Sequence, residues 1–395
     1  MSEGFALVQR MGVRIQVARS IDWKGSAMED GNVLIYGDSR SYSLRHEVPL
    51  PFPDPVAYLE VGGKRWVLAG AVDIPRLTSL GAQAGFDVVS FEDLGLGDAM
   101  RAGRPLSEAI VETLVEACRR FAVSAVRTPA DFPVGAADQL RAAGVDVRPD
   151  GAGFDLRRRR KTPQELAGIR RGIRAAEAAM VEIRDSLRRA DDATVEELRG
   201  AAQAAVIRHG AVPHDMTIIA PGPQGADQHD QGSGVIARNV PIVVDIFPRD
   251  LESGCWGDLT RTLCVGEPPE ELVAWHQQVR EAQCRATEAV RPGISGAELN
   301  QIAMDCLAEH GHPTRHGGVE VEDGFAHYLG HGLGLDLHEA PTLDEGGEVL
   351  IPGDVVTIEP GLYRRDFGGC RIEDVVFVTE DGYELLTDCP YDLVV

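Results

Sequence analysis

The sequence predicts two domains: an α/β domain over residues 1–155, then an α+β domain over residues 162–395 that is built from two related halves. Three observations predict this arrangement. The chain has 395 residues, which exceeds a typical single domain. Apolar β-rich runs alternate with helical ones up to about residue 155. Beyond that point, two helices followed by apolar strands occur twice in the same order.

In the N-terminal domain, apolar segments predict four strands, two helices and a short fifth strand. We expect the strands at Val33–Tyr36, Val56–Leu59, Trp66–Ala69 and Asp87–Ser90, the helices at Ser107–Phe121 and Val134–Ala143, and the last strand at Val145–Val147. The segment contains no glycine loop of the kind that cradles phosphate, and nothing in it assembles an active site.

The boundary between the domains is expected at a basic run, Arg157–Lys161, which we interpret as a solvated linker. Directly after it, Thr162 and Glu165 form a capping box with Pro163 at the first helical position, which is a strong start signal for a helix. Apolar residues then recur at steps of three, four or seven and give this helix one apolar face: Leu166, Ile169, Ile173, Met180, Ile183 and Leu187.

Each half of the C-terminal domain is expected to contain a helix pair followed by strands. In the first half, the long helix is followed by a second capping box at Thr194, whose helix stops at Gly210. In the second half, a helix at about Pro269–Val290 precedes a capping box at Ser295, whose helix stops at Gly311. A site at the interface of two such halves would draw residues from both.

The composition argues against several classes of partner. The net charge is −23, from 39 basic and 62 acidic residues, and phosphate binding requires concentrated positive charge. Nucleic acid and anionic membrane surfaces are therefore not expected as partners. No apolar run approaches the length of a membrane span, and the first residues lack the pattern of a signal peptide. The seven scattered cysteines show no CxxC pair and predict reduced thiols in a cytoplasmic protein.

Five residues of the C-terminal domain would suit one dinuclear metal site. Each lies in a short, apolar, glycine-punctuated segment that is typical of a strand or a tight turn: Asp245, Asp258, His331, Glu359 and Glu373. Carboxylates are costly to bury unless a charge or a metal ion accompanies them. Four carboxylates and one imidazole can bind two hard or borderline divalent ions, because carboxylates can bridge. The pattern therefore favours a hydrolase.

Taken singly, these residues have plainer explanations. Asp258 could be a turn aspartate, His331 a hydrogen-bonded histidine, and Glu359 a residue that precedes a turn. Together, five such groups are hard to explain as independent, satisfied polar residues.

Two other motifs carry weaker signals. The glycines from Gly330 to Gly334 lack the following helix that a nucleotide-binding loop needs. Three histidines follow the expected end of a helix, and a solvated helix C-terminus explains them better than a metal site does: His310, His312 and His316.

Four strings follow Asp245 along the chain: Asp258-Leu-Thr-Arg-Thr262, Gly330-His-Gly-Leu-Gly-Leu-Asp-Leu-His-Glu339, Ile358-Glu-Pro-Gly-Leu-Tyr363 and Arg371-Ile-Glu-Asp374. In this order they resemble the pita-bread metallopeptidases, which include Xaa-Pro aminopeptidases, Xaa-Pro dipeptidases (prolidases), methionine aminopeptidases and the metal-free creatinases. The resemblance covers roughly Thr162 to the C-terminus. It implies that residues 162–395 form a pita-bread fold with an internal pseudo-twofold repeat. This domain would follow a creatinase-like α/β domain at residues 1–155.

The resemblance also implies roles for the five candidate ligands. Asp245 and Asp258 match the paired aspartates, of which the second bridges two metal ions. His331 and Glu359 would complete the sphere of one ion, and Glu373 would bridge as well. Water or hydroxide held between the ions would be the nucleophile.

Four further residues match positions on the substrate side of the family's site. His229 matches a histidine that stabilises the tetrahedral intermediate or contacts the substrate amide, and His338 one that contacts the substrate carbonyl. His327 resembles a substrate-side histidine of the Xaa-Pro aminopeptidases. Arg371 resembles an arginine that orients ligands and relays protons in the prolyl-specific members.

From this resemblance we expect a cytoplasmic, homodimeric exopeptidase that uses two divalent metal ions. Manganese is expected first, with cobalt, zinc or iron as alternatives. The expected substrate is a small peptide with proline second, cleaved as by an Xaa-Pro aminopeptidase. The alternatives are an Xaa-Pro dipeptidase, a creatinase-like amidinohydrolase and a non-catalytic binding protein on the same scaffold. The complete set of five ligands argues against the last two.

Overall fold

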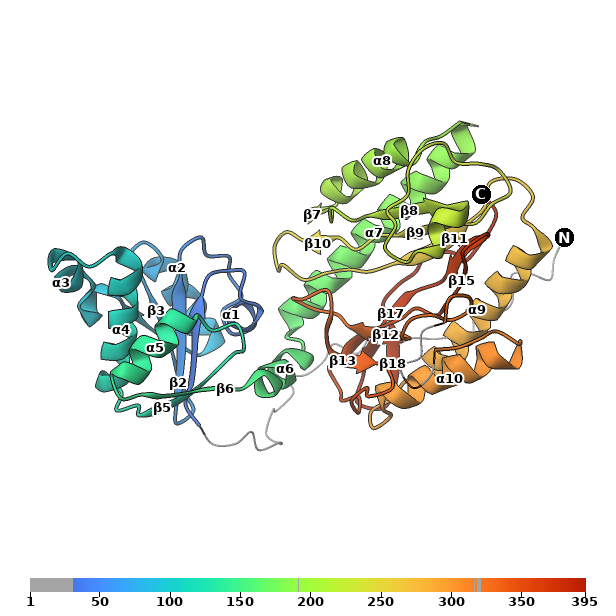
Figure 1. The fold of residues 1–395 in the computed structure, drawn as a ribbon. Coiled ribbons are helices and arrows are strands. Elements are labelled where there is room, and N and C mark those ends of the chain that lie inside the picture. The colour runs from blue at the N-terminus through green and yellow to red at the C-terminus, as the bar shows by residue number, and fades with distance from the viewer. Residues whose placement is uncertain (1–30, 191, 316, 318–320) are drawn as a thin grey trace.

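The computed structural model describes residues 31–190, 192–315, 317 and 321–395, and its N-terminal part is a six-stranded mixed sheet flanked by helices (Figure 1). The strand order is β4-β3-β2-β1-β5-β6. The strands are β1 (Val33–Gly37), β2 (Val56–Val61), β3 (Lys64–Ala69), β4 (Asp87–Ser90), β5 (Ala125–Thr128) and β6 (Asp146–Pro149). The helices are α1 (Tyr42–Glu47), α2 (Ile74–Ala84), η2 (Glu92–Leu94), α3 (Leu96–Arg101), α4 (Leu106–Arg120), α5 (Val134–Ala142) and α6 (Gly151–Arg159).

Both faces of this sheet are buried, because side chains alternate along each strand. Leu34 and Leu59 belong to a hydrophobic cluster that includes residues of α4, whereas Ile35 and Tyr58 belong to a second cluster that includes residues of α2. The five predicted strands and the two predicted helices are confirmed to within a few residues. Helix α2 is not predicted, because Gly81 lowers the helical propensity of this segment. The structure needs a glycine there for packing, since a Cβ at position 81 would lie 2.4 Å from the Phe86 carbonyl oxygen.

The C-terminal part consists of two helix pairs, each followed by an antiparallel three-stranded meander. In the first half, α7 (Pro163–Arg189) and α8 (Val195–Arg208) precede β8 (Ile218–Pro221), β9 (Ile242–Asp245) and β11 (Thr260–Leu263). In the second, α9 (Glu270–Ala289) and α10 (Gly296–Glu309) precede β12 (Gly330–Gly332), β14 (Val355–Ile358) and β17 (Asp374–Val378). This is the repeat that the order of helices and strands predicts.

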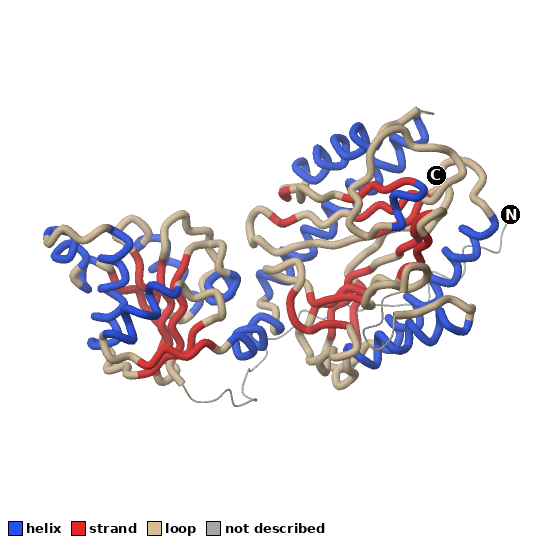
Figure 2. The backbone as a smooth tube through the Cα atoms, viewed as in Figure 1, coloured by secondary structure: helices blue, strands red, loops and turns tan. Residues whose placement is uncertain are grey.

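The remaining strands either extend the second meander or form two separate two-stranded sheets, β7 with β10 and β15 with β16. Strands β13 and β18 add to the second meander, which becomes a five-stranded sheet in the order β13-β12-β14-β17-β18. The elements are β7 (Ala211–Val212), η3 (Gly222–Ala226), β10 (Arg249–Asp250), β13 (Glu339–Leu343), β15 (Gly361–Arg364), β16 (Gly368–Arg371) and β18 (Tyr383–Leu385). In Figure 2 the strands lie in the middle of this part, with α7 and α8 on one side and α9 and α10 on the other.

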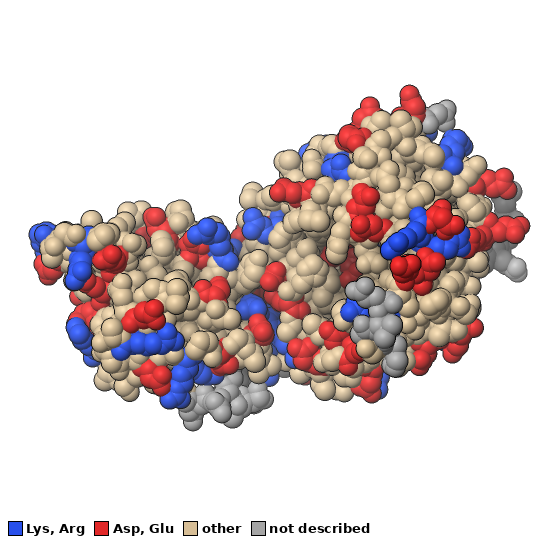
Figure 3. All heavy atoms as spheres, viewed as in Figure 1, with Lys and Arg blue, Asp and Glu red and all other residues tan. Residues whose placement is uncertain are grey.

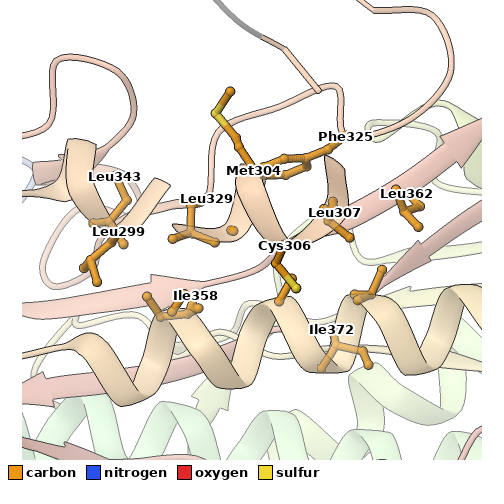
Figure 4. Close-up of a cluster of buried hydrophobic side chains, with 14 of the residues drawn as sticks. Leu299, Met304, Cys306, Leu307, Phe325, Leu329, Leu343, Ile358, Leu362 and Ile372 are labelled. Atoms are coloured by element: carbon orange, nitrogen blue, oxygen red, sulfur yellow. The ribbon is translucent and has the colours of Figure 1, made fainter. Parts of the chain in front are cut away.

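All three predicted capping boxes are formed. In each, the side chain of the first residue accepts the backbone N–H of the glutamate three positions on, whose side chain accepts the first residue's N–H: Thr162, Thr194 and Ser295. Each half also has its own hydrophobic cluster. Figure 4 shows the cluster of the second half, where Cys306 from α10 lies among leucines and isoleucines that include Ile358 and Ile372. The helix pairs thus fix the strands that carry the candidate ligands.

The basic run Arg157–Lys161 is not the solvated linker that the sequence predicts. It closes α6 and continues to the start of α7, and its side chains pair with acids on both parts of the chain. The ion pairs are Arg157–Glu47, Arg157–Glu60, Arg159–Asp354 and Lys161–Glu339. The prediction is wrong because these acids are far away in the sequence, so no local pattern reveals them. The division of the chain into domains at residues 155 and 162 stays a prediction.

On the face that Figure 3 shows, the acidic side chains are spread out rather than gathered in one patch. Figure 3 shows aspartates and glutamates on both parts of the visible face, with lysines and arginines between them. Within the described residues, no helix is both long and apolar enough to cross a membrane.

Loss of the Lys161 ammonium is expected to destabilise the protein. Its side chain and that of Glu339 are each only 2% exposed, so Lys161→Met leaves this buried carboxylate with only the more distant Arg158, whose Nε lies 3.6 Å from Glu339 Oε2. We predict a loss of about 3 kcal/mol in the free energy of unfolding, measured by urea denaturation. Adding Glu339→Gln should recover much of the loss. The exposed Lys64→Met is the matched control, and equal midpoints for the two single variants would contradict the assignment.

Candidate metal centre

All nine residues singled out in the sequence line one cavity. Its volume is about 710 Å³. The set comprises the five candidate ligands and the four substrate-side residues: Asp245, Asp258, His331, Glu359, Glu373, His229, His327, His338 and Arg371. Residues from both meanders contribute, so the cavity lies where the two halves meet.

Strand register brings the acids of each half to one end of its sheet. Asp245 at the end of β9 pairs with Thr260, which lies two residues after Asp258. In the other half, Ile358 of β14 pairs with Asp374 of β17, so that Glu359 and Glu373 leave the sheet at the same end. Antiparallel pairing therefore places residues that are distant in sequence next to one another.

A short contact joins the two halves at the cavity. The backbone N–H of Glu373 donates to the Thr260 carbonyl at 3.1 Å, and the Thr260 hydroxyl donates to Glu373 Oε2 at 2.9 Å. His331 is brought close by Gly330, where a Cβ would lie 2.2 Å from the Thr357 carbonyl oxygen. Only glycine allows β12 and β14 to approach this closely.

His331 presents one nitrogen to the acids. Its Nδ1 lies 3.1 Å from the Gly332 carbonyl oxygen, which favours a proton on Nδ1 and a free lone pair on Nε2. Nε2 lies 3.8 Å from Asp258 Oδ2 and 3.4 Å from Glu359 Oε1. Ligand atoms of Asp258, His331 and Glu373 all lie within 4.8 Å of one another, a spacing that a metal ion could span.

Asp245 has one satisfied and one unsatisfied oxygen. Its Oδ2 accepts a hydrogen bond from Arg371 Nη2 at 2.6 Å, whereas its Oδ1 is buried with no hydrogen-bond partner among the described residues. A buried carboxylate oxygen without a partner is costly, and a cation would satisfy it. With four carboxylates and one imidazole, the donor set fits divalent cations.

The pKa values at the cavity reflect buried negative charge. Burial, with the neighbouring Asp245 charge, raises the pKa of Glu359 to about 7. Burial and neighbouring carboxylates also raise the pKa of Asp258 and of Glu373 well above the ordinary values. Burial lowers the pKa of His331 to about 3, so its imidazole is neutral at physiological pH and able to bind a cation. Without bound cations, Asp258, Glu359 and Glu373 therefore hold protons more readily than exposed acids do.

A hydrogen-bonded chain runs behind the acids. Arg371 donates from Nε to the Thr260 hydroxyl at 3.3 Å and from Nη1 to the Tyr363 hydroxyl at 3.1 Å. The Tyr363 oxygen lies 2.9 Å from Nε2 of His327, whose Nδ1 lies 2.7 Å from the Tyr328 carbonyl oxygen. Burial lowers the pKa of His327 to about 3, so this ring is neutral and its Nε2 accepts the Tyr363 hydroxyl proton.

The other two predicted histidines lie at the open side of the cavity. The ring of His338 lies edge-on to that of His331, with 4.2 Å between their centroids. His229 is exposed, and its backbone N–H donates to Asp227 Oδ1 at 2.9 Å. Both imidazoles can therefore reach a molecule in the cavity.

Several residues in the cavity or directly behind it are missed from the sequence alone. Tyr363 and Thr260 lie inside the recognised strings, but nothing in their spacing marks them as partners of Arg371. Phe247 and His214 form an aromatic wall, with 4.8 Å between their ring centroids. Their contact depends on tertiary structure, so no short sequence pattern could have found it.

His310 and His312 lie outside this cavity. His310 Nε2 contacts Glu281 at 3.1 Å, and these two residues and Cys306 lie close enough to hold an ion. Arg285 also pairs with Glu281, however, and supplies the positive charge there. His312 contacts Gln278, and His316 lies outside the described residues.

The fold and the cluster of buried acids with histidine define a metallopeptidase. The chain belongs to metallopeptidase family M24, which it matches over residues 167–380. It is 31% identical over 340 residues to the "Probable dipeptidase PepE" of Mycobacterium tuberculosis, covering 83% of each chain. It is 36% identical over 241 residues to the Xaa-Pro dipeptidase of Pyrococcus furiosus, covering 59% of this chain and 64% of the other.

A solved structure of a similar protein shows the same fold. The prolidase from Pyrococcus horikoshii OT3 matches with a TM-score of 0.72 and 26% sequence identity, covering 92% of this chain and 95% of the other. The predicted fold, an α/β N-terminal domain followed by a pita-bread domain, is therefore confirmed. Membership of the family implies divalent metal ions as cofactors.

Metal binding should depend steeply on pH. The pKa of Glu359 is about 7, so this carboxyl is protonated at about pH 6 and must lose its proton when an ion binds. We predict that the affinity for Mn²⁺ rises with pH, by roughly tenfold per pH unit for each displaced proton, and levels off above the pKa. Calorimetric titrations in buffers of different protonation enthalpy would measure the released protons. Equal affinity and no proton release at about pH 6 and about pH 8 would contradict the raised pKa values.

Proposed function

We propose that this protein is a dinuclear metallo-exopeptidase that hydrolyses Xaa-Pro dipeptides. The observation that carries the proposal is the cavity in which four carboxylates, three of them buried, converge with one neutral imidazole, while Asp245 Oδ1 has no hydrogen-bond partner among the described residues. Uncompensated carboxylates are costly to bury, and bound divalent cations would balance their charge.

The proposed ligands are the five residues whose acids and imidazole meet in the cavity. Asp258 and Glu373 would be shared between two ions, because each carboxylate has two oxygens to offer. Asp245 would bind through its free Oδ1, and His331 through Nε2 beside Glu359. Two bound divalent ions would lower the pKa of a shared water and polarise the scissile carbonyl.

The protein's own groups would position the substrate around that centre. Arg371 holds Asp245 Oδ2 at 2.6 Å and so directs Oδ1 toward the cavity. His338 and His229 lie at the open side, where an imidazole can donate to the substrate carbonyl or stabilise the oxyanion that forms during attack. The hydrogen bond between the Tyr363 hydroxyl and His327 Nε2 fixes the His327 ring. In this orientation, His327 would contact the prolyl side of the substrate.

The comparisons favour a dipeptidase over the aminopeptidase that the sequence places first. The relative from Pyrococcus furiosus is named an Xaa-Pro dipeptidase, that from Mycobacterium tuberculosis a dipeptidase, and the matching structure a prolidase. We therefore propose the dipeptide as the substrate, with the aminopeptidase as the second candidate because His327 resembles a residue of that branch.

Three further parts of the proposal concern the protein's setting. Manganese is proposed as the native metal, because carboxylates and imidazole suit it. A cytoplasmic location is supported by the seven cysteines, all of which are free thiols. A homodimer is proposed from the family resemblance alone.

Hydrolysis of Ala-Pro beside the tripeptide Ala-Pro-Ala tests the proposed function. We predict that the Mn²⁺-loaded protein cleaves Ala-Pro, cleaves Ala-Pro-Ala much more slowly, and loses activity with a chelator. Asp258→Asn should lower kcat by at least about 10³-fold, because it removes a shared ligand. The exposed Asp381→Asn is the matched control. Faster cleavage of the tripeptide would favour the aminopeptidase, and no cleavage of either peptide by metal-loaded protein would refute the prolyl assignment.

His338→Gln should separate chemistry from metal binding. We predict a fall in kcat of about 10² to 10⁴, the usual contribution of a positioned acid or oxyanion donor, with the metal content unchanged. His312→Gln is the control, since His312 contacts Gln278 outside the cavity. A parallel loss of bound metal in His338→Gln would instead assign His338 to the ligand set.

A further inference from the structure

Arg315 is a second arginine at the metal cavity, and it lies in the segment between α10 and β12. Its backbone N–H donates to the Phe325 carbonyl at 2.9 Å, which fixes the main chain. Its guanidinium carbon lies 4.5 Å from the centroid of the Tyr328 ring, a cation–π contact that limits the orientations of the side chain. The guanidinium is thus held beside the cavity in a restricted position.

This guanidinium has no acid partner among the described residues. Its Nε is buried and without a hydrogen-bond acceptor, although a buried polar group normally has one. The cavity's other arginine, Arg371, donates to Asp245, Thr260 and Tyr363. Arg315 is therefore the one arginine among the described lining residues that is free to bind an incoming anion.

The charges of the cavity make an anionic ligand reasonable. Two divalent cations would balance the four carboxylates of the centre, so the positive charge of Arg315 would remain uncompensated. Asp344 also lines the cavity, but its Oδ1 accepts the N–H of Gly346 at 2.7 Å and makes no ion pair with Arg315. A planar guanidinium with several N–H donors matches the geometry of a carboxylate, and a carboxylate is the anionic group that a peptide substrate carries.

We propose that Arg315 binds the C-terminal carboxylate of the substrate and so selects dipeptides by length. The inference rests on the proposed function. A dipeptide has one free carboxylate, on the prolyl residue directly after the scissile bond. In a longer peptide, a neutral amide occupies that place and cannot form the ion pair. Arg315 is thus a specificity-determining residue, and it would also distinguish dipeptidase from aminopeptidase action.

Comparing Ala-Pro with its amide, Ala-Pro-NH2, tests this role. The two substrates share every group except the charge of the terminal carboxylate. We predict that the Mn²⁺-loaded wild type prefers Ala-Pro in kcat/KM, and that Arg315→Gln lowers this preference by about 10- to 100-fold through a higher KM for Ala-Pro. The rate with Ala-Pro-NH2 should stay unchanged, and Arg315→Lys should keep part of the preference. The exposed Arg365→Gln, outside the cavity, is the control.

The outcomes separate this inference from the proposed function. An equal loss on both substrates in Arg315→Gln would assign a structural role to Arg315 and overturn the inference, as would an unchanged preference. If the wild type cleaves neither substrate, the proposed function fails. Binding of L-proline and L-prolinamide to the metal-loaded protein then tests Arg315 directly. Weaker binding of L-proline alone in Arg315→Gln would support carboxylate recognition, and an equal effect on both compounds would overturn it.

Discussion

The gathering of four carboxylates, three of them buried, around one cavity is the constraint on which the rest of this structure depends. Isolated buried acids are costly, and here burial raises the pKa of Glu359 to about 7. One arginine, Arg371, offsets part of the charge by pairing with Asp245. This one arginine does not balance the remaining carboxylate charge, and the uncompensated charge gives the cavity its affinity for cations.

The pita-bread arrangement is what makes this burial possible. Each half contributes a meander whose acids leave the sheet at one end, and the two ends are joined by the contacts between Glu373 and Thr260. Next to the site, Arg261 forms a buried ion pair with Asp374 at 2.9 Å, which ties β11 to β17. The positions of the ligands are therefore set by backbone register and by ion pairs between the halves, and not by flexible loops.

Local patterns in the sequence predict much of this structure, but partners across the fold escape them. The capping boxes at Thr162, Thr194 and Ser295 are local, and all three form. Most of the nine candidate site residues lie in recognisable strings or beside them, and the fold brings all nine to one cavity. By contrast, the partners of the basic run, such as Glu339 for Lys161, lie far away in the sequence. The roles of Arg315 and Tyr363 likewise depend on residues that surround them in the folded protein, so the local sequence does not predict them.

If the five converging residues hold two divalent ions, the metal content of the protein must show them. Equilibrium dialysis against Mn²⁺, followed by elemental analysis, measures this content. We expect two ions per wild-type chain and the loss of at least one in a Glu373→Gln variant that remains folded. A wild-type protein that retains no ion, or a variant with the same metal content as the wild type, would contradict this expectation.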